Sequence, residues 1–233
     1  MKLTLAFDIY NKEKWIASLL NSWLSNLSGK NEYEFIVVFD DLKDKSKEIA
    51  DKKFREYKYS YLSLFASNKY EIFCDNLAFA HATGEYIIFI QDDNWIYDKN
   101  WDSTLTEIIA KIPNLGVIGF LSGLRVLVPP IHWKCIEADR PHKGRYFEMR
   151  GIKSCTLAVW QIDAINRPFC VSKQLLQGLG GLDKDFEPTY GDDFDLSLKL
   201  LQKGRTNIYI PFDLKNTGGF KETLDRELFK KTK

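Results

Sequence analysis

The stretch GEYIIFIQDDN, residues 84–94, joins an unbroken apolar run to an abrupt polar end. Tyr86 to Ile90 has the composition of a strand buried on both faces, which is typical of parallel sheets. Asp92 and Asp93 follow at once, and two like charges held close together repel each other. A divalent cation such as Mg²⁺ or Mn²⁺ would relieve that repulsion and could bridge to a diphosphate. The acids could instead cap the next helix, so both interpretations stay open.

The spacing of apolar residues changes repeatedly along the chain between strand-like and helical periods, which predicts alternating strands and helices. Leu3 to Ile9 and Phe35 to Phe39 are short apolar runs, and residues 15–24 between them show helical spacing. This unit is typical of two parallel strands joined by a crossover helix. Further helices are expected over 44–55, 76–82, 101–112, 171–179 and 193–202, and further strands over 117–121 and 207–210. We therefore predict a single α/β domain.

Composition and charge exclude several classes of protein. The chain has 233 residues, with 33 Lys and Arg against 32 Asp and Glu, a formal net charge of +1. This balance lacks the basic excess that a nucleic-acid partner demands. The four cysteines show neither a disulfide framework nor zinc-ligand spacing. No apolar run is long enough to cross a bilayer, and the N-terminal apolar stretch is too short for a signal peptide. We expect a soluble, cytoplasmic protein of a reducing compartment.

Two segments lack a clear period. Residues 122–153 are punctuated by proline and glycine and mix basic with aromatic residues, among them His132 and His142. A stretch of this length without clear structure is often a binding loop or lid, although a solvated charged loop has the same composition. The tail over 221–233 mixes leucine and phenylalanine with lysine. It could make a peripheral contact with an anionic membrane or form an ordinary amphipathic helix.

Acidic residues recur where the predicted strands end. Asp8, Asp40-Asp41 and Asp92-Asp93 each follow an apolar run, and ligands of open α/β sheets bind at the carboxyl ends of the strands. A second acidic group, GDDFDL over 191–196, opens a predicted helix. Its three acids in four positions exceed what a helix cap needs, although the helix dipole stabilises acids there. One of them could act as a general base if it faced a cleft.

The order of these motifs resembles the family 2 glycosyltransferases. Tyr10-Asn11-Lys12 follows the first strand, Asp40-Asp41 the second, and GEYI over 84–87 leads into the acids of the third. The later blocks GGLDKDF over 180–186 and GDDFDL over 191–196 are similar to the acceptor-side segment of that family and of the animal galactosyltransferases. The blocks are individually weak, but their order and spacing are specific over most of the chain.

The resemblance implies a GT-A fold, a single α/β domain over 1–233 with a mixed, mostly parallel central sheet flanked by helices. Residues 1–121 would form the half that binds the nucleotide-sugar donor. Residues 122–233 would form the acceptor-binding half, with a loop at 122–153. The partners implied are a nucleotide-diphospho-sugar and a glycan, glycolipid or glycoprotein acceptor.

On the donor side, the resemblance assigns roles to individual residues. Asp41 would accept a hydrogen bond from the nucleotide base, usually uracil, and Tyr10 would stack on or border that base. Asp8 stands where relatives often have a small hydroxyl residue, so the base pocket would differ there. Asp92 would hold the ribose or a metal-bound water. Asp93 of this DXD-type motif would ligate Mn²⁺ or Mg²⁺, which acts as a Lewis acid on the leaving diphosphate.

Asn76 matches an asparagine common in relatives and would flank the donor. On the acceptor side, Asp193 matches the aspartate that deprotonates the acceptor hydroxyl, and direct attack would invert the anomeric carbon. Asp192 stands where relatives usually have Glu and would bind the acceptor or orient the base. Trp160 is a candidate for stacking on an acceptor sugar, although a tryptophan is commonly a core residue.

Two departures from the family pattern qualify these expectations. Many GT-A enzymes place a histidine near the C-terminus as a further metal ligand, and residues 215–219 contain none. The Gln-x-x-Arg-Trp motif of processive synthases is also absent from the sequence. The resulting hypothesis is an inverting, metal-dependent, nonprocessive transferase of one hexosyl or deoxyhexosyl group, using a UDP-sugar. The alternatives are a catalytically silent nucleotide-sugar-binding module of a larger assembly and a nucleotidyltransferase.

Overall fold

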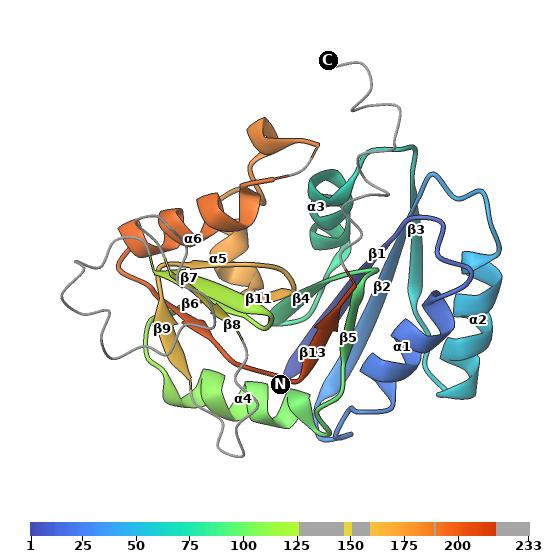
Figure 1. Cartoon of the computed structure of the whole chain (residues 1–233), viewed down its shortest axis with the longest axis horizontal. Helices are drawn as coiled ribbons and strands as arrows, with labels where there is room; N and C mark the ends of the chain where they lie inside the picture. Colours follow the sequence, from blue (N-terminus) through green and yellow to red (C-terminus); the bar gives the residue numbers. More distant parts are fainter. Residues whose placement is uncertain (126–146, 151–158, 189, 218–233) are drawn as a thin grey trace.

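The computed structural model describes residues 1–125, 147–150, 159–188 and 190–217. The strands of its central sheet are β1 Lys2–Ile9, β2 Glu32–Asp40, β3 Leu62–Ala66, β4 Tyr86–Gln91, β6 Leu115–Gly119, β9 Trp160–Ile162, β11 Phe169–Ser172 and β12 Thr206–Tyr209. Within the described ranges these eight strands follow the order β3-β2-β1-β4-β11-β6-β12-β9 (Figure 1).

The sheet is mixed. Strands β3, β2, β1 and β4 run parallel to one another, and β12 runs parallel to β6. Strand β11 lies antiparallel between β4 and β6, and β9 pairs antiparallel with β12. This arrangement confirms the predicted α/β class with a mostly parallel sheet.

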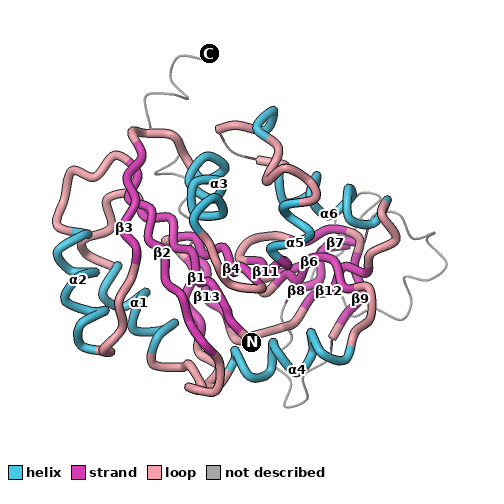
Figure 2. Tube along the Cα trace, turned by 180° about the vertical axis from the view of Figure 1, so that it is seen from behind, coloured by secondary structure: helices cyan, strands magenta, loops and turns pink. Residues whose placement is uncertain are grey.

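Helices cover both faces of the sheet (Figures 1 and 2). One apolar core lies beneath α1 Ile16–Leu24, α2 Ser46–Glu56 and α4 Trp101–Lys111. A second core lies beneath α3 Glu71–His81, α5 Lys173–Gln177 and α6 Asp192–Gln202. None of the described helices combines the length and apolar character that crossing a bilayer requires.

Side-chain alternation along the strands decides which residues meet which helices. The odd-numbered apolar residues of β1 belong to the core beneath α1, whereas Ala6 belongs to the core beneath α3. The same period of two places Asp8, Asp40 and Gln91 on the α3 face. Each lies two residues beyond the last apolar residue of its strand on that face. The polar ends of three parallel strands therefore converge on α3.

Two smaller sheets complete the description. Strands β7 Ser122–Arg125 and β8 Phe147–Arg150 pair with each other, and β10 Ala164–Ile165 pairs with β7. Strand β5 Asn94–Ile96 pairs with β13 Leu214–Asn216, which brings the end of the described chain beside the acids that follow β4.

The structure corrects the sequence-based elements at particular places. The helix predicted over 171–179 is present as the shorter α5, and the first two residues of that range belong to strand β11, because Phe169 to Val171 are buried between β4 and β6. Helix α3 begins at Glu71 rather than at Asn76. Strand β3 was not predicted. The tail over 221–233, His132, His142 and most of the loop at 122–153 lie outside the described residues.

Gly84 should be essential to the pairing of β1 with β4, because a Cβ there would lie 2.5 Å from Oγ1 and 2.7 Å from N of Thr4. We expect Gly84→Ala to lower the free energy of unfolding by about 1–3 kcal/mol, measured by chemical denaturation. Gly178→Ala is the matched control, since the nearest atoms to its Cβ lie at 3.5 Å. Equal stability of the two variants would contradict the close packing at Gly84.

Candidate active site

Asp92 lies directly after β4 and is held by the turn that follows β1. Its Oδ2 accepts a hydrogen bond from the backbone N–H of Tyr10 at 2.9 Å. Its Oδ1 lies 3.6 Å from Nζ of Lys12, whose side chain is only 9% exposed. The parallel pairing of β1 with β4 brings these two strand ends together. Asp92 is thus fixed in orientation, with a buried cation beside it.

Asp93 lies beside the segment that follows β12. Its Oδ1 accepts a hydrogen bond from Nδ2 of Asn94 at 2.7 Å, and its backbone carbonyl accepts one from the N–H of Thr217 at 3.1 Å. Asn216 donates through Nδ2 to Oδ1 of the fully buried Asn94 at 3.1 Å. Residues 215–217, in the stretch where many GT-A enzymes have a metal-binding histidine, therefore lie next to Asp93. The described residues of the stretch 215–219 are Lys215, Asn216 and Thr217.

The two acids at the end of β2 differ in position. Asp40 is buried and accepts hydrogen bonds from the backbone N–H groups of Lys69 at 2.8 Å and Tyr70 at 2.9 Å, so it fixes the start of α3. Asp41 lies in the turn beyond the strand and pairs with the exposed Lys43 at 2.7 Å. Asn11 holds this turn, because its Nδ2 donates to the carbonyl of Asp41 at 3.0 Å. Asp41 is the acid of the pair that stands at the surface.

Asp8 lies on the α3 face in register with Gln91. Its Oδ1 is buried without a hydrogen-bond partner among the described residues. Burial raises the pKa of this carboxyl well above its usual value, and the charges of Asp75 and Asp92 raise it further. Burial also raises the pKa of the neighbouring Cys74 thiol, with Asp8 adding to the rise. This corner of the site therefore favours uncharged forms.

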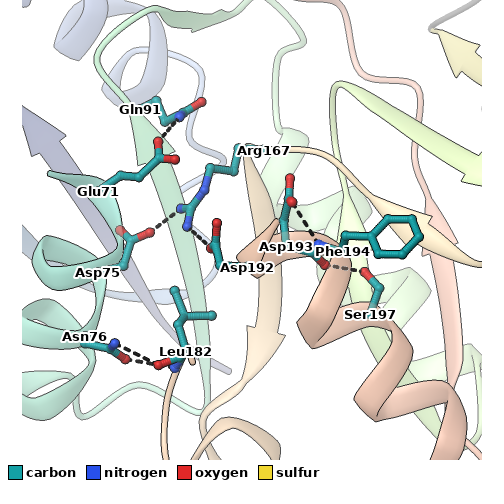
Figure 3. A network of polar contacts seen from close by, with 10 residues as sticks. All are labelled: Glu71, Asp75, Asn76, Gln91, Arg167, Leu182, Asp192, Asp193, Phe194 and Ser197. Atoms are coloured by element: carbon teal, nitrogen blue, oxygen red, sulfur yellow. Dashed lines mark hydrogen bonds and ion pairs between the residues drawn. The ribbon is translucent and has the colours of Figure 1, made fainter. Parts of the chain in front are cut away.

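A buried ionic bridge links α3 to α6 (Figure 3). Nη1 of Arg167 pairs with Oδ2 of Asp75 on α3, and Nη2 pairs with Oδ2 of Asp192, the first residue of α6. Burial raises the pKa of Asp75 to about 7; Arg167 opposes this rise, and Asp192 adds to it. Burial acts to lower the pKa of Arg167, but Asp192 and Asp75 outweigh that effect and raise it. The guanidinium therefore stays charged.

Asp193 follows Asp192 in the first turn of α6. Its Oδ1 accepts a hydrogen bond from the backbone N–H of Phe194 at 2.8 Å, and its carbonyl accepts one from Oγ of Ser197 at 2.6 Å. Burial raises the pKa of Asp193 to about 7; the charge of Asp192 adds to the rise, and Arg167 opposes it. A carboxylate with a pKa near neutrality is suited to accept a proton at physiological pH.

Asn76 joins α3 to the segment before α6. Its Nδ2 donates to the carbonyl of Leu182 at 2.9 Å, and its Oδ1 accepts from the N–H of Leu182 at 2.8 Å. A Cβ on Gly181, whose φ is +99°, would lie 2.6 Å from that Oδ1. The side-chain amide of Asn76 is thus engaged in fixing the glycine-rich segment, and its role toward a donor stays a prediction.

The remaining acceptor-side candidate, Trp160, lies apart from the acids. It is on edge strand β9, opposite Tyr209 of β12, and three strands separate β9 from β4. Its side chain is partly buried against the core beneath α6. The structure therefore brings Asp8 and Asp193 toward α3, holds Asp92 against the turn after β1, and leaves Trp160 at the far edge of the sheet.

Electrostatic contacts join the donor-side and acceptor-side acids through Glu71, the first residue of α3. Its Oε2 accepts a hydrogen bond from Nε2 of Gln91 at 2.5 Å. Its charge raises the pKa of Asp8 on one side and of Asp193 on the other, behind the larger effect of burial in both. Glu71 thus acts electrostatically on an acid of each group.

Asp92 and Asp93 could hold a metal ion only with help from a ligand. In the described ranges, no group of three or more His, Cys, Asp or Glu has the arrangement of a metal site. Mg²⁺ is commonly bound by one or two carboxylates, with substrate phosphates and water completing its shell. Two adjacent carboxylates at a strand end fit a cation that is held together with a diphosphate.

Sequence reasoning missed Arg167, Asp75, Glu71 and the pairing of Lys12. Arg167 precedes β11, which reads as a helix by its apolar spacing. A four-residue apolar run FCVS before a helix was the available signal for a strand. Asp75 and Glu71 lie on the part of α3 that was not predicted.

The fold and the acids at its strand ends define the class, an α/β domain with a mixed, mostly parallel sheet and acidic residues at the carboxyl ends of its parallel strands. The chain belongs to glycosyl transferase family 2, whose sequence profile matches residues 6–123.

Among similar proteins is TarS of Staphylococcus aureus, a poly(ribitol-phosphate) beta-N-acetylglucosaminyltransferase, which is 30% identical over 96 residues. This match covers 41% of the chain and 17% of TarS. The structure of TarS 1–349 in complex with UDP-GlcNAc superposes with a TM-score of 0.61 at 19% identity, over 90% of this chain and 58% of that one. GalNAc-T7 with UDP, GalNAc and Mn²⁺ gives 0.71 at 13% identity, over 93% and 44%. The shared fold is GT-A, and the chain spans less than two thirds of each relative.

The raised pKa of Asp193 predicts a pH-dependent penalty on folding. The folded state holds this proton up to about pH 7, whereas an unfolded Asp releases it near pH 4, so ionisation between these values lowers stability. We expect Asp193→Asn to gain about 1–3 kcal/mol relative to the wild type on going from pH 5 to pH 8, measured by urea denaturation. Asp183→Asn should show no such change over this range, because Lys199 lowers the pKa of Asp183 and that carboxyl is ionised in both the folded and the unfolded state above pH 5. Parallel curves for wild type and Asp193→Asn would contradict the assignment.

Proposed function

We propose that this protein transfers one sugar from a UDP-sugar to an acceptor hydroxyl, with Asp193 as the general base. The observation that carries the proposal is the placement of Asp193, with a pKa of about 7, in the first turn of α6, next to Asp192, which Arg167 joins to Asp75 on α3. Family membership supports the reaction class. The bound UDP-GlcNAc of TarS supports UDP as the nucleotide and makes UDP-GlcNAc the first donor to test.

Residues 1–121 form the donor half of this proposal. Asp41 would accept from the uracil ring at the surface turn held by Asn11, and Tyr10 would border the same base. Burial raises the pKa of Asp8, and the protonated form of this carboxyl would donate a hydrogen bond that an ionised acid could not. Asn76 would shape the donor pocket indirectly through its hold on Leu182.

Asp93 would ligate Mn²⁺ or Mg²⁺ with the diphosphate, and Asp92 would hold the ribose or a metal-bound water. A bound cation would stabilise the charge that develops on the leaving UDP. Lys12 supports the same region, since its buried ammonium already offsets the charge of Asp92. The Mn²⁺ in the GalNAc-T7 structure supports a metal-dependent reaction of this type.

In the transfer step, the Asp193 carboxylate takes the proton of the acceptor hydroxyl. The acceptor oxygen forms a bond to the anomeric carbon, and the bond from that carbon to the β-phosphate oxygen breaks. UDP leaves with the electron pair, and attack opposite to it inverts the anomeric carbon. Such a reaction depends mainly on positioning and charge stabilisation, because the diphosphate is already a good leaving group.

The acceptor half over 122–233 would bind a glycan, glycolipid or glycoprotein, with Asp192 orienting the base. Trp160 is retained as an acceptor contact only for a long acceptor, given its place at the edge of the sheet. Nonprocessive transfer of a hexosyl or deoxyhexosyl group and a cytoplasmic location stay predictions. A nucleotidyltransferase would release pyrophosphate rather than UDP, and a silent module would release neither.

We expect UDP with Mn²⁺ to raise the melting temperature of the protein by about 5 °C at a hundredfold excess over Kd. GDP, CDP and dTDP should give smaller shifts. Asp93→Ala should remove the dependence on Mn²⁺, and Asp41→Ala should weaken the shift with UDP. Asp51→Asn, on the distant helix α2, is the control and should respond as the wild type does. An unchanged Mn²⁺ response in Asp93→Ala would refute its assignment as a ligand.

We expect Asp193→Asn to keep the thermal shift with UDP and to lose at least about a hundredfold in UDP release from UDP-GlcNAc. Asp195→Asn, two positions further along α6, removes an acid that pairs with Lys199 at 2.7 Å and should retain turnover. Wild-type activity in Asp193→Asn would assign the base to another residue.

A further inference from the structure

Arg167 is the buried cation between the two halves of the molecule. It lies in the segment between β10 and β11, is 6% exposed, and reaches Asp75 on α3 with one nitrogen and Asp192 on α6 with the other (Figure 3). Its guanidinium carbon also lies 5.1 Å from the centre of the Phe169 ring. The planar fork of an arginine suits two carboxylates at once, which a lysine ammonium cannot bridge in the same geometry.

The position of Arg167 follows from the sheet. Strand β11 is antiparallel to β4, with Phe169 opposite Phe89, so the residues before β11 lie at the edge where β4 ends. Phe169 belongs to the core beneath α3, and alternation carries Arg167 to that same face. The guanidinium of Arg167 therefore lies on the same face of the sheet as Asp8, Gln91 and α3.

The charges around Asp193 do not balance without this cation. Among the described residues, the charged groups that face Asp193 are Asp192 on its own helix, Arg167 before β11 and Glu71 on α3, with Asp75 behind Arg167. Two of the three groups in direct electrostatic contact are acids, and both raise the pKa of Asp193, whereas Arg167 lowers it. Loss of Arg167 would leave buried carboxylates with no counter-charge, which is strongly unfavourable.

We propose that Arg167 is a positioning residue for Asp193: by holding Asp192 against Asp75 it fixes the first turn of α6 and keeps the Asp193 carboxylate available as the base. The proposal rests on the proposed function of Asp193. Arg167 acts through Asp192, since its two printed ion pairs go to Asp75 and Asp192 and neither goes to Asp193. The bridge also ties the acceptor-side helix to the helix that adjoins the donor-side acids.

The same helix offers a matched control. Lys199 also lies between two carboxylates, Asp183 at 2.6 Å and Asp195 at 2.7 Å, but its side chain is 37% exposed. An exposed pair of this kind contributes little, because water and salt screen it. Lys199→Met therefore removes a bridging cation from α6 without disturbing the buried bridge.

The test is the pH profile of UDP release from UDP-GlcNAc with water as acceptor. Arg167→Met should lower kcat. It should also move the midpoint on the acidic side of the kcat–pH profile upward by about one pH unit, which means a tenfold lower kcat at pH values well below that midpoint. Arg167→Lys keeps the charge and should lower kcat with the limb almost unmoved. Asp75→Asn leaves Arg167 less neutralised and should move the limb downward. Lys199→Met should leave the profile unchanged, and equal shifts in Lys199→Met and Arg167→Met would overturn the proposal.

A second measurement needs no turnover. The carboxyl carbon of Asp193, assigned with Asp193→Asn, is titrated by ¹³C NMR in the full chain. Its midpoint should lie near pH 7 in the wild type and rise in Arg167→Met. An unmoved midpoint overturns the proposal even if the enzyme is active. If Arg167→Met does not fold, the opposite shift in Asp75→Asn decides the same question, and no shift there overturns it.

The two hypotheses fail separately. Full turnover in Asp193→Asn refutes the base, and with it the catalytic meaning of the bridge. The positioning role alone is refuted by a different pair of results. In that case Asp193→Asn loses turnover, but the Arg167 and Asp75 variants leave both the pH profile of kcat and the NMR midpoint of Asp193 unchanged.

Discussion

The pleat of three parallel strands is the constraint on which the site depends. Strict alternation buries one set of side chains beneath α1 and places the other set on the α3 side of the sheet. The face on which the last polar residue of each strand lies is therefore fixed by its position in the strand. Asp8 and Gln91 lie in register on neighbouring strands, and Asp40 ends the next one. A slip of one residue in β1 would exchange Asp8 for Phe7 or Ile9 at the site and turn the acid toward the opposite core.

The acids on one face of the sheet repel one another, and two features of the structure reduce this repulsion. Lys12 and Arg167 are both buried, and each contacts carboxylates that come from another element. Where no cation is close, as at Asp8, burial favours the protonated carboxyl. Burial raises the pKa of Asp8, Asp75 and Asp193, and Arg167 opposes this rise at Asp75 and Asp193.

Sequence patterns were sufficient for three of the four mutually parallel strands, β1, β2 and β4, but not for β3. The strands through Leu3, Phe35 and Tyr86 and the helices between them are local features with a clear period, and the acids that follow them are visible as abrupt polar ends. The bridge at Arg167 could not be predicted in this way. Its position depends on β11 entering the sheet antiparallel, and FCVSKQLLQ has spacing that also suits a helix. Asp75 has no distinctive sequence signal, because its partner Arg167 lies 92 positions further along the chain.

The pairing of β13 with β5 has a consequence for the order in which the site is assembled during synthesis. Asn216 contacts Asn94 across 122 positions of the chain, and the neighbouring Thr217 bonds to Asp93. Strands β1, β2 and β4 leave the ribosome long before these residues at about 5–20 residues per second. The acids that follow β1, β2 and β4 are therefore synthesised several seconds before α6. The contacts of Asp93 with Thr217 and of Asn94 with Asn216 can form only after the last strand of the described chain has been made.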